Sequence, residues 1–98
     1  MKYQVRLSEA AISDITIIKQ WVAAKAGPEG ATDYINRNDK KFATLANFPN
    51  KGTPRPDFSP GCRSTTFERR YLIVYRVMDD FVRVERIVDG YRDWEWLK

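Results

Sequence analysis

The stretch KYQVRLSEAAISDITIIKQWV, residues 2–22, places a strand pattern directly before a helix pattern. Polar and apolar residues alternate through 2–7, which is typical of a strand with one solvent-facing side. Ser8 then stands where the N-cap of a helix is expected, and the helix dipole favours Glu9 in the first turn. Apolar residues recur from there at helical spacing, with Trp21 beside them: Ala11, Ile12, Ile15, Ile18 and Val22. The stretch predicts a strand followed by an amphipathic helix.

Gly27 and Pro28 are predicted to end this helix, because glycine is a common C-cap residue and proline cannot continue a helix. A second helix is expected to begin near Pro28 or Glu29. The inward face of this helix consists of Ala31, Tyr34, Ile35, Phe42 and Leu45. Asn38 interrupts that face. It is either a buried amide with its hydrogen bonds satisfied or a residue at a point open to a partner, and the first reading is favoured because buried polar groups are usually hydrogen bonded.

Residues 47–61 contain four prolines and two glycines and are predicted to form a loop. A loop this long is uncommon in a small domain and is usually functional or ordered for a reason. After it, the alternation of polar and apolar residues returns and predicts strands at 62–68, 71–78 and 81–89. The second of these strands is apolar on both faces, which favours a central position in the sheet.

In the last predicted strand, Val82, Val84 and Val88 share a face with Arg86. We expect this arginine to have a carboxylate or carbonyl partner, because a buried charge must be paired. The predicted order is β-α-α-β-β-β in one domain, residues 1–98. This is an α+β fold in which a helical hairpin packs on an antiparallel sheet. Residues 93–98 close the chain as a short helix or an aromatic tail.

The composition excludes several classes of function. The chain has 98 residues, 43% of them apolar, and no apolar run near the ~20 residues of a membrane span. With one cysteine and no histidine, it cannot form an internal disulfide, a zinc-finger ligand set or an imidazole acid–base pair. We expect no metal, no cofactor and a cytoplasmic location. Cys62, next to Arg63, is interpreted as a small buried residue at a strand start rather than an activated thiol.

Cationic side chains are concentrated in residues 61–78, where four arginines are opposed only by Glu68. The four are Arg63, Arg69, Arg70 and Arg76. They form either an ordinary solvated sheet face or a cationic groove for acidic side chains or RNA phosphates. Near the end of the chain, Trp94 and Trp96 cannot easily both be buried. Either one of them is an exposed aromatic side chain that binds a partner, or this terminal segment packs onto the rest of the fold.

Longer patterns run along the whole chain in a specific order. They are Tyr3-x-Val5-Arg6-Leu7-Ser8-x-x-Ala11, Phe48-Pro49-x-x-Gly52-x-x-Arg55-Pro56-Asp57, Pro60-Gly61-x-Arg63-Ser64, Tyr71-x-Ile73-x-Tyr75-Arg76-Val77 and Arg86-Ile87-x-x-Gly90-x-Arg92-Asp93-Trp94. In order and spacing the chain resembles the RelE/ParE superfamily of bacterial toxins, and its ParE branch in particular. One departure is Asp89-Gly90, where ParE members commonly have His-Gly before the Arg-Asp pair.

The resemblance to ParE implies a toxin that inhibits DNA gyrase, is neutralised by a cognate ParD-like antitoxin and contacts DNA only through the antitoxin complex. An acidic and apolar antitoxin segment is expected to meet Arg63, Arg69 and Arg76 through its carboxylates, and Trp21 or Tyr34 through its apolar side chains. The candidate target-binding residues are Arg92, Trp94, Trp96 and Leu97.

The alternative implied by the superfamily is a RelE-type endoribonuclease that cuts ribosome-bound messenger RNA with Lys, Arg and Tyr side chains. The matching strand positions hold Arg63, Thr65 and Leu72, and no tyrosine follows Tyr91. These departures disfavour a nuclease, so no catalytic residue is assigned. A third reading is an accessory binding domain without toxicity.

Overall fold

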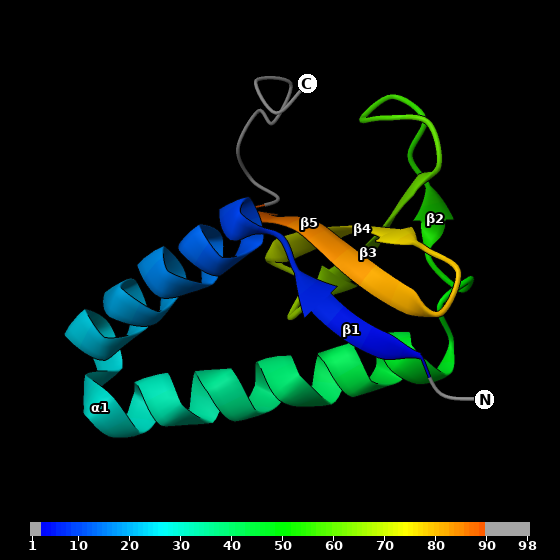
Figure 1. Ribbon diagram of the computed structural model, residues 1–98. Coiled ribbons are helices and arrows are strands. Elements are labelled where there is room, and N and C mark those ends of the chain that lie inside the picture. The colour runs from blue at the N-terminus through cyan, green and yellow to red at the C-terminus, as the bar shows by residue number, and fades with distance from the viewer. Residues whose placement is uncertain (1–2, 90–98) are drawn as a thin grey trace.

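The computed structural model describes residues 3–89 (Figure 1). Its elements are β1 (Gln4–Leu7), α1 (Glu9–Asn47), β2 (Thr53–Pro54), β3 (Cys62–Phe67), β4 (Tyr71–Val77) and β5 (Phe81–Asp89). One long, sharply bent helix packs on a five-stranded sheet. The predicted α+β class is confirmed. The predicted loop also contains β2, a two-residue strand that pairs with Arg63 and Ser64.

The bend in α1 lies at Gly27, where φ is 77° and ψ is 179°. Glycine tolerates this left-handed backbone, and the following Pro28 starts a new helical segment. We call residues 9–26 the first arm and residues 28–47 the second arm. The two arms diverge from the bend as a V (Figure 1), which is the predicted hairpin. The predicted N-cap is also confirmed, because the Ser8 hydroxyl accepts a hydrogen bond from the Ala11 N–H at 3.0 Å.

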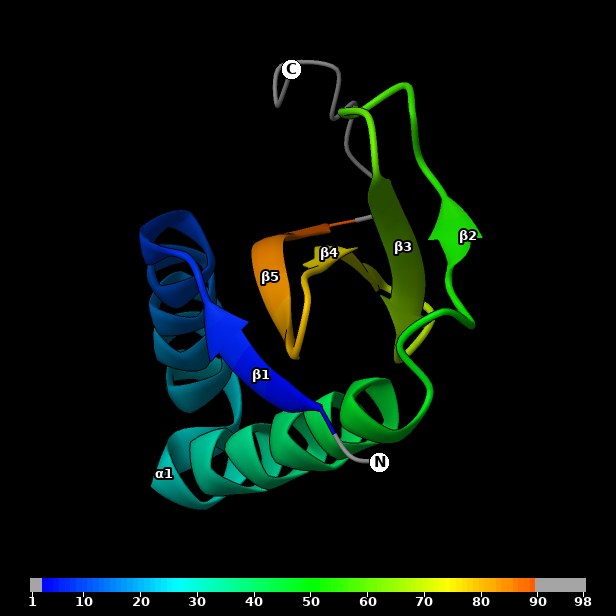
Figure 2. The ribbon, with the colours of Figure 1, turned by 45° about the vertical axis from the view of Figure 1, so that its right-hand side comes forward.

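The strands are ordered β1-β5-β4-β3-β2. Neighbouring strands are antiparallel except for β1 and β5, which pair in parallel. The expectation of a purely antiparallel sheet is therefore wrong at one edge. Parallel pairing requires a crossover connection, and the chain between β1 and β5, which includes α1, provides it. β1 lies next to β5 and between the two arms (Figure 2).

The main core lies between α1 and one face of the sheet. Strand β4 is central, as predicted, and its residues Tyr71 to Tyr75 are buried on both faces. The helix-facing cluster consists of Ala11, Tyr34, Leu45, Phe67, Tyr71, Ile73, Tyr75, Val82, Val84 and Ile87. A smaller cluster on the opposite face consists of Cys62, Leu72, Val74 and Val88, with Phe58 packed against it.

A β-bulge interrupts the pairing of β4 with β5. Val74 is opposite Arg86, whereas Tyr75 is opposite Val84, so Glu85 is the extra residue. An extra residue reverses the faces of the side chains that follow it. Val88 consequently lies on the face opposite Val84, and the predicted shared face of the strand is wrong beyond the bulge.

The expected carboxylate partner of Arg86 is Asp14 on the first arm. The two side chains form paired hydrogen bonds of 2.8 and 2.9 Å, and these bonds raise the pKa of Arg86. The Ile87 N–H also donates to the Asp14 carboxylate, and the Ser8 hydroxyl donates to the Glu85 carbonyl. The start of α1 thus covers the edge of β5 beyond the end of β1.

Candidate interaction surface

Three large apolar side chains of the first arm are exposed, those of Ile12, Ile17 and Trp21, and the last two lie four residues apart. Ile17 is 62% exposed and Trp21 is 45% exposed. Residues four apart lie on the same side of a helix, so these two side chains form one apolar strip that faces away from the core. The sequence pattern marked Trp21 as a candidate binding residue but gave Ile17 no role.

Cationic side chains flank Trp21. The Arg70 guanidinium carbon lies 4.6 Å from the centre of the Trp21 ring and 5.4 Å from that of Tyr71, and Lys25 Nζ lies 5.9 Å from Trp21. Cation–π attraction holds such pairs together. The contact of Lys25 with Trp21 could have been predicted from the sequence, because the two residues are four apart on one helix. No local sequence pattern predicts the contact of Arg70 with Trp21.

The turn between β3 and β4 is strained. Glu68 and Arg69 have positive φ angles of 55° and 58°, a backbone that normally favours Gly or Asn. Glu68 forms an ion pair with Arg37 of the second arm, and Arg69 is exposed. Strain of this kind is concentrated at functional sites. We use the name Trp21 surface for Ile17, Trp21, Lys25, Arg69 and Arg70.

Tyr34, a candidate for contact with a partner, belongs to the core. Only 1% of it is exposed, and its ring meets Phe67 and Tyr71 edge to face, with centroids 6.0 and 6.5 Å away. Burial raises the pKa of Tyr34 to about 12. Its side chain therefore supports the Trp21 surface through Tyr71 but offers no exposed area of its own.

Arg63 holds the loop between α1 and β2. Its guanidinium donates to the carbonyls of Asn50 at 3.1 Å and Gly52 at 2.8 Å. The neighbouring Tyr75 hydroxyl donates to the Pro49 carbonyl and accepts from the Gly52 N–H, both at 2.9 Å. We call these five residues the loop clamp. The guanidinium of Arg63 is thus already occupied by backbone oxygens.

Arg76 lies on the other face of the sheet. It is opposite Cys62, whereas Arg63 is opposite Tyr75, and side chains of successive strand residues alternate between faces. Arg76 hydrogen bonds to Ser59 at 3.0 Å and contacts Glu85 at 3.8 Å. Burial raises the pKa of the Cys62 thiol, in agreement with its predicted structural role. The structure therefore does not gather Arg63, Arg69 and Arg76 into one groove.

The remaining candidates, Arg92, Trp94, Trp96 and Leu97, lie outside the described residues. Within residues 3–89, no group of His, Cys, Asp and Glu side chains could hold a metal ion. None of the helical segments in that range has the length and apolar character that a membrane crossing requires.

Comparisons with known proteins agree with this fold. The family model described as "ParE toxin of type II toxin-antitoxin system, parDE" matches residues 5–94. A solved structure titled "Chromosomal ParDE TA system from P. aeruginosa" is 25% identical, with a TM-score of 0.75 over 90% of this chain and 96% of that chain. None of the curated proteins compared with the chain matches it. Since the family model covers nearly the whole sequence, the chain belongs to the ParE toxin family of type II toxin–antitoxin systems.

Proposed function

We propose that this ParE toxin inhibits DNA gyrase and that a cognate, ParD-like antitoxin neutralises it by binding the Trp21 surface. The family match over residues 5–94 carries the proposal. Both proteins act in the cytoplasm, and the toxin contacts DNA only within the antitoxin complex. A lone, buried Cys62 fits that reducing compartment.

The Trp21 surface indicates the chemistry of the antitoxin segment. Trp21 and Ile17 offer exposed apolar area, and Lys25 and Arg70 place positive charge beside Trp21. The exposed Arg69 precedes Arg70 in the same turn. The whole chain carries a net charge of +4. Tryptophan and arginine dominate the energetics of protein interfaces, and opposite charge speeds association. An acidic segment with apolar side chains fits this surface.

The contacts of Arg63 also favour an inhibitor over a ribonuclease. RNA cleavage requires a base, an acid and a cation that stabilises the phosphate, each in contact with the reacting atoms. Arg63 is held by the carbonyls of Asn50 and Gly52, and Leu72 is a buried apolar residue. These two positions therefore supply little of the required chemistry.

Two assays with the purified full chain test the proposed activity. The chain should reduce supercoiling of plasmid DNA by gyrase, and the protein encoded by the adjacent gene should restore it. Programmed ribosomes should keep their messenger RNA intact. Unchanged supercoiling together with cuts in the message would show the RelE-type activity instead.

A binding experiment tests the antitoxin site. Trp21→Ala should weaken the toxin–antitoxin complex by about tenfold or more, as expected for an interface tryptophan. Lys25→Glu should weaken it by slowing association. Lys19→Glu is the matched control, because this exposed lysine lies on the opposite side of the first arm. Equal affinities for all variants would place the antitoxin elsewhere.

A further inference from the structure

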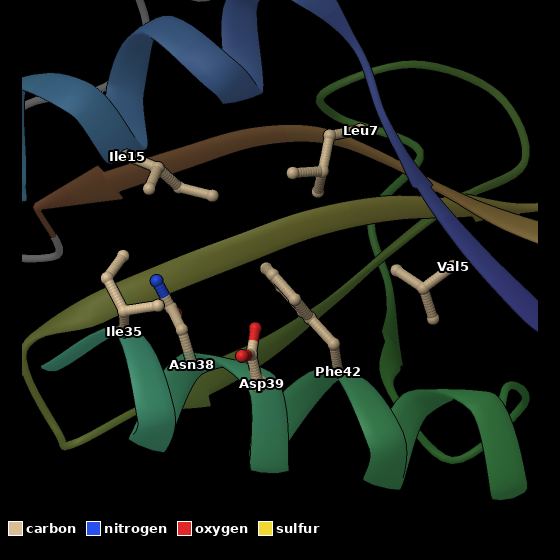
Figure 3. Close-up of a pocket in the computed structure, with 7 residues that line it drawn as sticks. All are labelled: Val5, Leu7, Ile15, Ile35, Asn38, Asp39 and Phe42. Carbon is tan, nitrogen blue, oxygen red and sulfur yellow. The ribbon is translucent and has the colours of Figure 1, made fainter. Parts of the chain in front are cut away.

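Three arginines lie side by side on the face of the sheet that points away from α1. Arg83 of β5 is paired with Arg6 of β1 on one side and with Arg76 of β4 on the other. The residues before and after Arg6, Val5 and Leu7, point toward α1 and line a pocket there (Figure 3). Arg76 and Arg83 likewise alternate with residues of the helix-facing core. Because successive side chains of a strand point to opposite faces, all three arginines share the other face, and we call them the arginine row.

The arginine row is unfavourable for folding. Neighbouring strands lie about 4.8 Å apart, and like charges directly opposite each other are destabilising. Among residues 3–89, only Glu85 forms an ion pair with members of the row. Three positive charges and one negative charge leave an excess of two positive charges at this site. Uncharged residues such as threonine suit a strand and avoid the repulsion, so the row is a poor choice for stability alone.

Arg76 and Arg83 already converge on an anionic oxygen. Glu85, the extra residue of the β-bulge, places its Oε1 2.6 Å from Nε of Arg83 and 3.8 Å from Nε of Arg76. The terminal nitrogens of Arg76 donate to the Ser59 hydroxyl at 3.0 Å and to the Pro60 carbonyl. Those of Arg83 make no hydrogen bond to any residue in 3–89, and 43% of its side chain is exposed. The centre of the row therefore offers N–H donors close to a point where an anion is already accepted.

Arg6 is held in place at the edge of the row. Its guanidinium carbon lies 4.2 Å from the centre of the Phe81 ring, and its Nη2 donates to the Gln4 side-chain oxygen at 3.2 Å. Its Nε and Nη1 make no hydrogen bond within the described part of the chain. The cation–π contact and the hydrogen bond restrict this side chain before a ligand arrives, which reduces the entropy lost on binding. The row thus has preoriented donors at its edge as well as at its centre.

The charge of the row selects the class of anion. A phosphate monoester carries about −1.5 to −2 charges near pH 7 and has three acceptor oxygens, whereas a carboxylate carries one charge on two oxygens. Guanidinium groups bind phosphate through paired hydrogen bonds. One phosphate monoester therefore matches the excess of two positive charges, and its three oxygens meet donors from more than one arginine.

The surroundings of the row favour a small molecule over a nucleic acid. Asp79 and Asp80 are exposed in the turn that joins β4 to β5. Each is three residues along the chain from a member of the row, which is about 10 Å in an extended strand. A chain of phosphates that continued along the strands would meet these carboxylates. A single phosphate at the row lies about one Debye length from them, where salt screens the repulsion.

We propose that the arginine row binds the phosphate monoester group of a small metabolite. Arg83 donates through its terminal nitrogens at the centre, Arg6 donates from the edge of the sheet, and Arg76 adds positive charge on the other side. Glu85 competes with the ligand as an internal anion. The row lies on the face of the sheet opposite the helix that carries Trp21, and the inference does not depend on the proposed gyrase inhibition.

Titrations of the full chain in phosphate-free buffer test the class of ligand. We expect ribose 5-phosphate and adenosine 5′-monophosphate to cause saturable shifts of the backbone amide resonances of β1, β4 and β5 in NMR spectra. Adenosine 3′,5′-cyclic monophosphate, a diester with one charge, and glutarate, a dicarboxylate, should each bind about tenfold more weakly. The absence of saturable shifts for both monoesters would overturn the proposal, as would equal or tighter binding of the diester or of glutarate.

Substitutions show whether the arginines form the site. Arg83→Gln and Arg6→Gln should each weaken binding of ribose 5-phosphate by about tenfold, because each removes charged donors to the phosphate. Lys40→Gln is the matched control, since it removes the same charge from an exposed position of α1, on the other side of the sheet, and should bind normally. Circular dichroism confirms that each variant is folded. Equal losses for the control and for both arginine variants would reduce the effect to general charge attraction and contradict the proposal.

Glu85→Gln should change binding in the opposite direction. It removes the carboxylate that competes with the ligand for Arg76 and Arg83, so ribose 5-phosphate should bind more tightly than to the wild type. Unchanged or weaker binding by this variant would show that the phosphate does not use the point where the two guanidiniums converge, and the site would be wrong as proposed.

Discussion

The loop clamp and the Trp21 surface both contain arginines that the sequence marks as candidates for binding, but they use them differently. In the loop clamp, Arg63 donates to two backbone carbonyls of the same chain. In the Trp21 surface, Arg69 is exposed in a strained turn and Arg70 stacks on an exposed tryptophan. Arginines that look alike in the sequence therefore differ in the structure, where one holds a loop of its own chain and another lies against an exposed aromatic ring.

The largest effect on folding is expected at Gly52 in the loop clamp. A Cβ at this position would lie 2.2 Å from the Tyr75 hydroxyl and 2.8 Å from the Ser64 carbonyl. Gly52→Ala should therefore lower the free energy of unfolding by about 3 kcal/mol, the upper end of the cost of overpacking. Urea unfolding measures this change, and the exposed Thr53→Ala serves as control. A loss under about 1 kcal/mol would mean that the loop moves away without cost.

The next largest effect concerns Tyr34 beneath the Trp21 surface. Burial raises its pKa from 10.0 to about 12, so the unfolded chain loses this proton first as the pH rises. The group's contribution to stability is complete below pH 10 and is lost between pH 10 and about 12. The loss corresponds to about 2–3 kcal/mol. Unfolding measured across this range should depend less on pH in Tyr34→Phe than in the wild type; equal dependence would contradict the assignment.

The sequence predicts those parts of the fold that depend on local periodicity. The strand before Ser8, the bend at Gly27 and the central position of β4 follow from spacing and from the chemistry of single residues. The parallel edge of the sheet and the bulge at Glu85 could not be predicted in this way. The parallel edge depends on the pairing of β1 with β5, which is distant in the sequence, and the bulge depends on one extra residue in a regular alternation.

The candidate interaction surface was predictable only in part. Trp21 and Arg69 could be selected because an aromatic residue and a cation occur at positions without an evident core role. The stacking of Arg70 on Trp21 and the capture of Arg63 by loop carbonyls depend on contacts between distant segments. For the same reason Tyr34, which has the pattern of both a core and a binding residue, could be assigned to the core only from the structure.

Substituting one arginine from each region tests their difference directly. Arg63→Ala should lower stability by about 1–2 kcal/mol, because two carbonyls lose a charged donor. Arg69→Ala should change stability by less than about 0.5 kcal/mol, as is usual for exposed residues, and should instead weaken antitoxin binding. Paired unfolding and binding measurements on the two variants check this. The comparison fails if Arg63→Ala folds as stably as the wild type and binds the antitoxin less well.

The smallest expected effect concerns the backbone of the turn that carries Arg69. An L-amino acid with a side chain at positive φ costs about 1–2 kcal/mol. Glycine removes this cost, but part of the gain in stability is lost because glycine gives the unfolded chain more conformational freedom. Arg69→Gly should therefore raise the free energy of unfolding by only about 0.5 kcal/mol, while it removes a cation from the Trp21 surface. A more stable protein with weaker antitoxin binding would show that the strain accompanies a binding role. Arg83→Gly, at φ outside the positive range in β5, is the control and should lose stability. If Arg69→Gly instead destabilises the fold, the strained turn serves the structure rather than the interaction, and the Trp21 surface loses one of its supports.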